Sequence, residues 1–433
     1  MATTEVSLNA QTWTRIARQG QSFTATCNTW FRYAEVVYDQ TPDAGIDGHL
    51  VGPDTEGYKL ISEETRGGYI YARLTSDRVP AGVVTVSTEE SYGSDFVFQV
   101  RTTSANEAFT LPCGNAGAYS ASIDWGDGSA ASAITSYNDA DLSHTYSHAG
   151  DHIIKVTGTL PWVYFNNGGH KTKLRKILNW GTVSSASHSG SYYGCANLDE
   201  LPEDGGFTGG ITCVSMFRDC SGLTSIDGSA WPMSTVTDTS YMFAGCSKIT
   251  SVDFGTGTLA ATTTCSNMFN GCAKLANVNA SNWTLASATT TTYMFYGCPV
   301  LTSIDLSSLD TTSLTVTNRM FTNDTLFSSI DTGSADFASL ADAALMFYGC
   351  AALSDIDTSA WDLSSLTNGT SMFQGSGFNQ ASYDILLTAI GGITPQSGVT
   401  FHAGTAKYGA AVASIHTDLT TTYTWTITDG GPA

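Results

Sequence analysis

Basic residues are scarce in this chain of 433 residues. Only 18 lysines and arginines stand against 39 aspartates and glutamates, and the net charge is −21. Nucleic-acid binding needs lysine and arginine opposite the phosphates, so this balance argues against a nucleic-acid partner. Long apolar runs are also missing, and without a stretch of about 18 apolar residues we expect no membrane span. The first twenty residues lack the apolar core of a signal peptide.

Compact catalytic and metal-binding motifs are equally scarce. The sequence holds no G-x-S-x-G, H-E-x-x-H or C-x-x-C motif, and its eight histidines follow no pattern. A hydrolase would need paired carboxylates in a cleft, or a nucleophile beside a base. We therefore expect that the protein is not an enzyme, with no catalytic residues and no bound cofactor.

The composition that is present is typical of β proteins. Hydrophobic residues make up 42% of the chain, aromatic residues 11% and charged residues 13%, with abundant Gly, Ser and Thr. These proportions indicate a β-rich, extracellular-type globular protein. The length exceeds one ordinary core, so we expect several domains.

A 26-residue repeat dominates the middle of the chain. Each unit carries a Met-Phe pair, and most units carry apolar residues six and nine positions later, as at Leu301 and Ile304. A period of about 20 to 50 residues is the signature of stacked coils, or a solenoid. The repeat phenylalanines are Phe217, Phe243, Phe269, Phe295, Phe321, Phe347 and Phe373.

The apolar spacing predicts one short strand in every unit. Segments such as LTSIDLS (301–307) alternate in the manner of a strand. One coil cannot bury its own apolar side chains but a stack can, so we expect a single parallel sheet with Met and Phe inside. The predicted strands are 174–180, 199–203, 224–228, 250–254, 276–280, 302–306, 328–332 and 354–358.

Cysteines form a ladder along the repeat. Side chains stacked on parallel coils point the same way, which is poor geometry for a disulfide. We interpret the ladder as reduced, buried packing residues, and a disulfide or metal array is the alternative. Its members are Cys195, Cys220, Cys246, Cys272, Cys298 and Cys350, and Asp324 and Ser376 interrupt it.

Aspartates form a second ladder, directly after the inward-facing Ile or Val of the predicted strands. This position points to solvent, and stacked like charges repel each other. The column therefore needs turn hydrogen bonds, which is our interpretation, or bound cations, with calcium as the alternative. Its members are Asp227, Asp253, Asp305, Asp331 and Asp357, with Asn279 in the gap.

The motif M-F-x-x-C-x-x-L-x-x-I-D carries a resemblance to a known family. Over residues 166–380 the repeat resembles the BspA-like leucine-rich repeats of bacterial surface proteins, mycoplasma lipoproteins and some phage proteins. The resemblance implies a right-handed solenoid that serves adhesion rather than catalysis.

Residues 96–165 are similar to a PKD-type, Ig-like domain. The similarity lies in IDWGDGSA (123–130) and HTYSHAGDHIIKVTG (144–158), which predict strands joined by turns. A domain of this kind would act as a spacer and would cap the first edge of the solenoid. We interpret three residues of the pattern as turn and strand-corner residues rather than as a metal or catalytic site: Asp124, Asp127 and His144.

Residues 1–95 form a predicted β-sandwich with strands at 13–27, 68–76 and 82–90. This segment holds seven of the 18 basic residues, six of them arginine. The order of its motifs resembles small β-sandwich domains that fix phage decoration proteins and fibres to the particle. The resemblance implies an attachment domain.

Residues 381–433 differ from the repeat and predict a small α/β cap. Apolar spacing predicts helices at 381–393 and 405–419, followed by a strand at 422–431. Repeat proteins need such atypical ends for solubility. The whole chain is thus predicted to be mainly β: a β-sandwich, a PKD/Ig-like β-sandwich, a leucine-rich-repeat-type solenoid of 26-residue coils, and this cap.

Taken together, these features predict a phage virion protein, such as a capsid decoration protein, head fibre or tail fibre. Residues 1–95 would join other virion proteins, such as the major capsid or tail proteins, and the solenoid would contact a host surface protein or glycan. The missing signal peptide favours this hypothesis over the alternative, a bacterial cell-surface BspA-like adhesin. Attachment to a symmetric particle favours a homo-oligomer, with a trimer as the first expectation.

Overall fold

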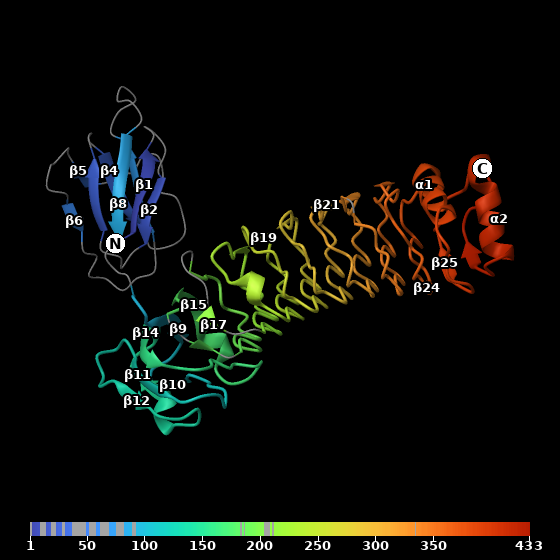
Figure 1. Ribbon diagram of the computed structural model, residues 1–433. Helices are drawn as coiled ribbons and strands as arrows, with labels where there is room; N and C mark the ends of the chain where they lie inside the picture. The colour runs from blue at the N-terminus through green and yellow to red at the C-terminus, as the bar shows by residue number, and fades with distance from the viewer. Residues whose placement is uncertain are drawn as a thin grey trace. The chain divides into compact units, whose positions relative to one another are not determined.

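The structure of the chain is a computed structural model. It describes the side chains of residues 92–433 except 182–186, 203–211, 334 and 355, and in residues 2–88 it describes the backbone of eight strands. The chain divides into two compact units, Met1–Gly93 and Ser94–Ala433. Within the described residues the secondary structure is mainly β, and the α-helices lie near the C-terminus (Figure 1).

The first unit contains two four-stranded antiparallel sheets. Its strands are β1 (Ala2–Leu8), β2 (Thr14–Arg18), β3 (Phe23–Cys27), β4 (Phe31–Val36), β5 (His49–Val51), β6 (Tyr58–Leu60), β7 (Tyr69–Leu74) and β8 (Gly82–Thr88). The sheet orders are β1-β8-β3-β6 and β2-β7-β4-β5. The predicted strands 68–76 and 82–90 are confirmed as β7 and β8. The single strand predicted over 13–27 is wrong, because β2 and β3 belong to different sheets, and Gly20 separates their two alternating segments.

The second unit begins with antiparallel strands. They are β9 (Phe96–Thr102), β10 (Glu107–Thr110), β11 (Ser120–Asp124), β12 (Ser132–Ile134), β13 (Ser143–Tyr146), β14 (Gly150–Thr159) and β15 (Leu174–Asn179). One sheet has the order β12-β11-β14-β9-β15, and β10 pairs with β13. Short 3-10 helices are η1 (Ala140–Leu142) and η2 (Lys171–Lys173). Phe98, Phe109 and Trp125 are fully buried in the core of this region.

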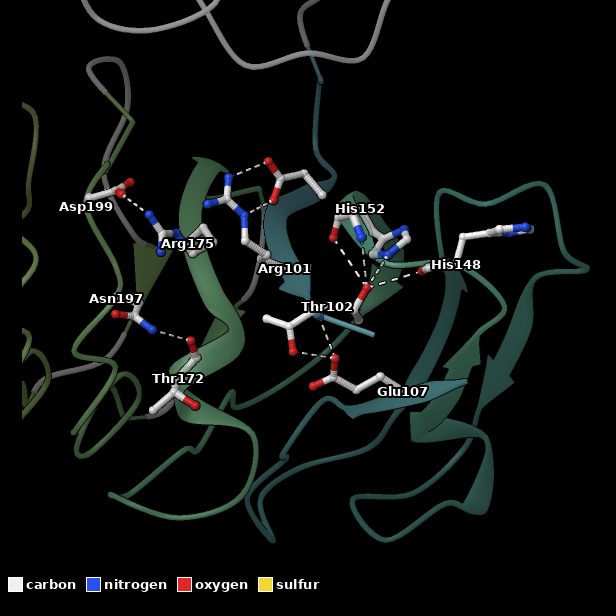
Figure 2. Close-up of polar contacts among 12 residues, drawn as sticks. Arg101, Thr102, Glu107, His148, His152, Thr172, Arg175, Asn197 and Asp199 are labelled. Carbon is white, nitrogen blue, oxygen red and sulfur yellow. Dashed lines mark hydrogen bonds and ion pairs between the residues drawn. The ribbon is translucent and has the colours of Figure 1, made fainter. Parts of the chain in front are cut away.

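Strand β15 joins this sheet to the repeat. On one side it pairs with β9 in the antiparallel direction, and on the other Lys176 bridges Glu200 in the parallel direction. Figure 2 shows the side chains that reinforce the joint: Arg175 donates to Asp199 at 2.8 Å, and the Asn197 amide donates to the Thr172 carbonyl at 2.7 Å. The first coil therefore has no open edge at β15.

From Thr212 to Asn368 one ladder of parallel bridges runs through every coil. It connects Thr212, Asp238, Thr264, Thr290, Val316, Asp342 and Asn368, each 26 residues from the next. Figure 1 shows the successive coils lying side by side between β19 (Ser251–Asp253) and β24 (Asn368–Gly369). A constant register at this ladder explains the constant period of the sequence.

The single parallel sheet expected at the L-x-x-I segments is wrong in detail. β18 (Ser225–Asp227), β19 and β20 (Asn277–Asn279) form one parallel sheet, and β21 (Ser303–Asp305), β22 (Ser329–Asp331) and β23 (Asp355–Ile356) form another. In the described part of the predicted strand 199–203 only the bridge at Glu200 is present. The predicted strand 174–180 is β15, which pairs with β9 in the antiparallel direction and so does not belong to a parallel sheet. Strands of three residues make few ladder hydrogen bonds, so a small displacement interrupts the pairing. The remaining short elements here are β16 (Ser184–Ser185), β17 (Thr208–Gly209) and η3 (Met233–Thr235).

The repeat Met and Phe lie inside the stack, as predicted. From Phe217 to Phe373 successive rings are 5.3–5.6 Å apart and within 2–14° of parallel. All seven phenylalanines have 0% exposure. Such stacked pairs add about 0.5–1.5 kcal/mol each beyond the area they bury.

The ladder cysteines have free, buried thiols that fill a hydrogen-bonding role. Each ladder thiol from Cys220 to Cys350 donates to a backbone carbonyl of the preceding coil, for example Cys246 to Phe217 at 3.0 Å and Cys350 to Phe321 at 2.9 Å. Burial holds the pKa of these thiols well above the usual value. All nine cysteines whose side chains are described are free, and Cys27 lies outside the described side chains.

Asp324 stands in this ladder where other coils have cysteine. It is fully buried, its Oδ1 accepts from the Cys298 N–H at 2.6 Å, and its Oδ2 has no hydrogen-bond partner among the described residues. Burial raises the pKa of this carboxyl from 3.8 to about 8, although the Cys298 hydrogen bond opposes the shift. The folded protein therefore holds Asp324 protonated near neutral pH.

The C-terminal cap continues the ladder and closes it with helices. The predicted helix 381–393 is confirmed as α1 (Gln380–Gly391). The helix predicted over 405–419 begins later than expected, as η4 (Ala410–Val412) followed by α2 (Ala413–Thr421). The predicted last strand, 422–431, is present over three residues as β26 (Thr426–Thr428). The sequence prediction missed β25 (Thr400–His402), which pairs in parallel between β24 and β26. The Asn379 side chain caps α1 by accepting from the Ser382 N–H.

Replacing Asp324 with Cys should stabilise the protein, and more so at higher pH. Between pH 3.8 and about 8 the folded state holds one proton more than the unfolded state, so stability falls as pH rises through this window. Each pH unit is worth about 1.4 kcal/mol, and we expect a gain of roughly 2–5 kcal/mol near pH 8. Guanidinium unfolding of the parent and the variant at about pH 4.5 and pH 8 measures this gain in the free energy of unfolding.

The matched control for this prediction is Asp331→Asn, which removes an exposed carboxylate of the same repeat. It should leave the unfolding midpoint nearly unchanged at both pH values. An Asp324→Cys gain that is the same at the two pH values would contradict the assignment of a buried, protonated carboxyl.

Candidate functional site

Each coil of the repeat bends through a left-handed residue two positions before its Phe. The φ angles there lie between 54° and 61°, from Ser215 to Ser371. The bend lets the N–H of this residue bond to the next coil, as Tyr241 does to the Ser266 carbonyl at 2.9 Å and Tyr293 to the Asn318 carbonyl at 3.0 Å. A left-handed non-glycine residue costs about 1 kcal/mol or more, and the inter-coil hydrogen bond offsets this cost.

Glycine is absent at this left-handed position in all seven coils. Two residues after the Phe the chain is left-handed again, and there five of seven residues are Gly, as at Gly245 and Gly297. Glycine is the residue with no steric cost in this region. At the first bend the chain carries residues with side chains instead, among them Tyr and Arg.

The first group of these side chains surrounds Arg218. Its guanidinium carbon lies 5.0 Å from the ring centre of Tyr193 and 4.8 Å from that of Tyr241. All three side chains are half-buried. Two cation–π contacts hold the guanidinium between neighbouring coils and leave the edge of its plane for hydrogen bonding.

A second group lies four coils further along. The Arg319 guanidinium carbon is 5.3 Å from the ring centre of Tyr293, which meets Tyr296 edge-on at 5.2 Å. Arg319 also donates to the Asn318 side chain at 3.1 Å. The two groups define what we call the Tyr–Arg face: Tyr193, Arg218, Tyr241, Tyr293, Tyr296 and Arg319.

The arginines of this face differ from the other arginines that the structure describes. Arg101 pairs with Asp151 at 2.6 Å and Arg175 with Asp199 at 2.8 Å. Within residues 92–433 as described, neither Arg218 nor Arg319 pairs with a carboxylate. In a chain of net charge −21, two positive groups are thus held in place with no acidic partner in the described part of the chain.

The aspartate column is explained by turns. Each member accepts a backbone N–H two residues later: Asp227 from Ser229, Asp253 from Gly255, Asp305 from Ser307, Asp331 from Gly333 and Asp357 from Ser359, at 2.7–3.1 Å. Hydrogen bonds from the side chain and N–H of Ser307 lower the pKa of Asp305. Asn279 donates to Asp253 at 2.9 Å, which separates the charges where the column changes residue type.

The three residues singled out in the PKD-like segment also serve local structure. Asp124 accepts the Gly126 N–H, and Asp127 accepts the Ser129 N–H and contacts the His144 ring nitrogen at 2.7 Å. Partial burial opposes the shift, but the hydrogen bonds from Ser129 and His144 lower the pKa of Asp127 to about 2. His144 stacks on Trp125 with ring centres 5.2 Å apart, so the pair braces a strand corner.

The sequence prediction missed the Tyr–Arg face. Its members occupy two fixed positions, two residues before and one residue after the repeat Phe, except for Tyr193 in the first coil. The residue type changes from coil to coil at both positions, so no motif marks them. The available signal was the combination of tyrosines and arginines at fixed distances from a buried Phe.

The fold defines the class of the protein. Stacked 26-residue coils with buried Met-Phe pairs make it a BspA-like repeat protein. The family profile described as "Mycoplasma protein of unknown function, DUF285" matches residues 165–277, 211–327 and 263–384. These overlapping matches run from 165 to 384, which is 220 of the 433 residues, and the chain belongs to this family.

No curated protein matches the chain, and no solved structure does. Among the described residues no helix is long and apolar enough to cross a membrane.

Calcium and chelator should give the same melting curve. The column aspartates already use Oδ1 for turn hydrogen bonds, and within the described ranges no three His, Cys, Asp or Glu side chains gather as a metal site. Circular dichroism melting in about 2 mM CaCl₂ and in EDTA tests this. A melting temperature that falls in EDTA, in the parent but not in Asp305→Asn, would show that the column binds a cation.

Proposed function

We propose that the chain is a non-enzymatic adhesion protein whose repeat stack is a leucine-rich-repeat-type solenoid that presents the Tyr–Arg face to a surface ligand. The observation that carries the proposal is the face itself, with half-buried tyrosines and two arginines that pair with no carboxylate among the residues that the structure describes. Tyrosine and arginine are, with tryptophan, the residues enriched at binding hot spots. The proposal includes a right-handed coil and an Ig-like, PKD-type fold for residues 96–165.

Rigidity supports this function. Inter-coil hydrogen bonds and stacked rings fix each bend, and the arginines are further fixed by tyrosine rings. Side chains held in this way lose little conformational entropy when a ligand binds. A stacked repeat also offers an extended surface, which repeat proteins commonly use for recognition.

The proposed carrier of the protein is a phage virion. In this proposal Met1–Gly93 forms a β-sandwich that joins the major capsid or tail proteins, and the protein is a head or tail component, with three copies at each site. The separate compactness of Met1–Gly93 supports a modular anchor. Its six arginines, a residue favoured at protein interfaces, support the same role.

A bacterial surface adhesin is the second candidate. The family match favours this candidate, because the description of the family names a Mycoplasma protein, and Mycoplasma is a bacterium. The repeat stack and its Tyr–Arg face would serve both candidates in the same way, and only the structure to which the protein is attached would differ.

Truncation should separate the anchor from the display region. Fragment 1–93 and the full chain should sediment with particles that lack the protein, whereas fragment 94–433 should stay in solution. The division at Gly93 is the physical reason for the cut. The measurement is co-sedimentation with purified particles, with circular dichroism melting of each fragment to confirm that it is folded.

The opposite distribution, with fragment 94–433 on the particles and fragment 1–93 in solution, would show that the anchor lies in residues 94–433 and contradict the proposal. If no folded fragment sediments, and antibodies against the chain label cell envelopes, the second candidate replaces the first.

A further inference from the structure

The two positions that form the Tyr–Arg face carry few apolar anchors. Beside the tyrosines and arginines they hold mainly short or polar residues, such as Asn267, Asn270 and Gln374, and Leu345 is a large aliphatic exception. Protein partners usually insert apolar side chains into a desolvated centre. A face of flat rings, amides and guanidinium groups is better suited to a sugar, whose ring faces stack on aromatic rings and whose hydroxyls take hydrogen bonds.

The two arginines of the face indicate that the ligand is negatively charged. From residue 181 onward the chain contains five basic residues, and both arginines among them lie on this face. A guanidinium stacked on tyrosine still offers its fork of N–H groups, which fits a carboxylate in a two-point hydrogen bond. The complementary group on the ligand is therefore a planar anion.

The spacing of the two arginines favours a polymer. They lie four coils apart, which is about 19 Å at the usual distance between parallel strands. Between them the half-buried Asn270 donates to the buried Asn267 at 2.7 Å, so that the Asn270 amide is a polar group held in place between the two arginines. A chain with an acidic group on many units can reach both arginines at once, and the second contact then benefits from the first.

We propose that the Tyr–Arg face binds a polysaccharide of carboxylate-bearing sugars, with Arg218 and Arg319 each receiving a sugar carboxylate. The tyrosines beside them hold the guanidinium groups and stack on the sugar rings. This inference rests on the proposed function, because it names the ligand class of the adhesive face.

The test is binding of the full chain to polygalacturonate by isothermal titration calorimetry. Fully methyl-esterified polygalacturonate keeps the sugar and removes the charge, and polyglutamate keeps the carboxylates and removes the sugar. We expect binding to polygalacturonate and at least about tenfold weaker binding to either control. The loss of one hydrogen bond to a charged group weakens binding by about this factor.

The variants compare equal losses of charge on two parts of the same stack. Arg218→Gln with Arg319→Gln should weaken binding about tenfold or more. Lys248→Gln with Lys274→Gln removes the same charge from exposed positions outside the face and should stay within about twofold. Arg218→Lys with Arg319→Lys keeps the charge but not the planar fork, and we expect an intermediate loss. Unchanged melting curves confirm that all variants are folded.

Each failure has a distinct meaning. Equal binding by the Arg218→Gln/Arg319→Gln variant and the Lys248→Gln/Lys274→Gln variant would overturn the inference. The absence of binding to polygalacturonate would overturn it as well. Equal affinity for the methyl ester would show that the carboxylate is not recognised. Equal affinity for polyglutamate would show that the sugar is not recognised and that the ligand is an acidic peptide. Either result also overturns the inference. The proposed function fails separately, when the full chain binds neither bacterial cells nor any of the polymers.

Discussion

Each coil of the repeat gives backbone hydrogen bonds to the next coil. The N–H of Phe217 bonds to the Met242 carbonyl, and the same bond recurs 26 residues later from Phe243 to Met268. Because a coil cannot satisfy these groups alone, every coil depends on a neighbour in the same register. The stacked Phe rings and the buried thiols follow this register, and so does the position of every exposed side chain.

The same constraint explains how one fold combines a dry interior with a varied surface. Inward positions repeat Met, Phe and Cys because neighbouring coils offer identical surroundings there. At the left-handed bend the backbone is fixed by its hydrogen bond to the next coil, so the side chain is free to differ between coils. Tyr241 and Arg319 occupy equivalent positions of different coils. The stack can therefore be altered at its surface without changing its core.

The sequence predicts the interior well and the surface poorly. The buried Phe column, the free cysteines and the cap helices follow from periodicity, because period reports burial. The Tyr–Arg face does not, because it depends on a left-handed bend that brings two sequence positions together. The aspartate column was correctly placed on the surface, and the turn hydrogen bonds expected for it are present. The strand β25 was missed because Thr400–His402 is too short to show a pattern.

Deletion of one complete repeat tests the register most directly. A variant without residues 263–288 loses 26 residues and restores the sequence pattern at the junction. It should unfold cooperatively in circular dichroism melting, within a few degrees of the parent, because every remaining coil keeps a matching neighbour. A variant without residues 264–288 loses 25 and shifts all later side chains by one position, so it should lose the cooperative transition or melt far lower. Equal melting of the two deletions would contradict the account.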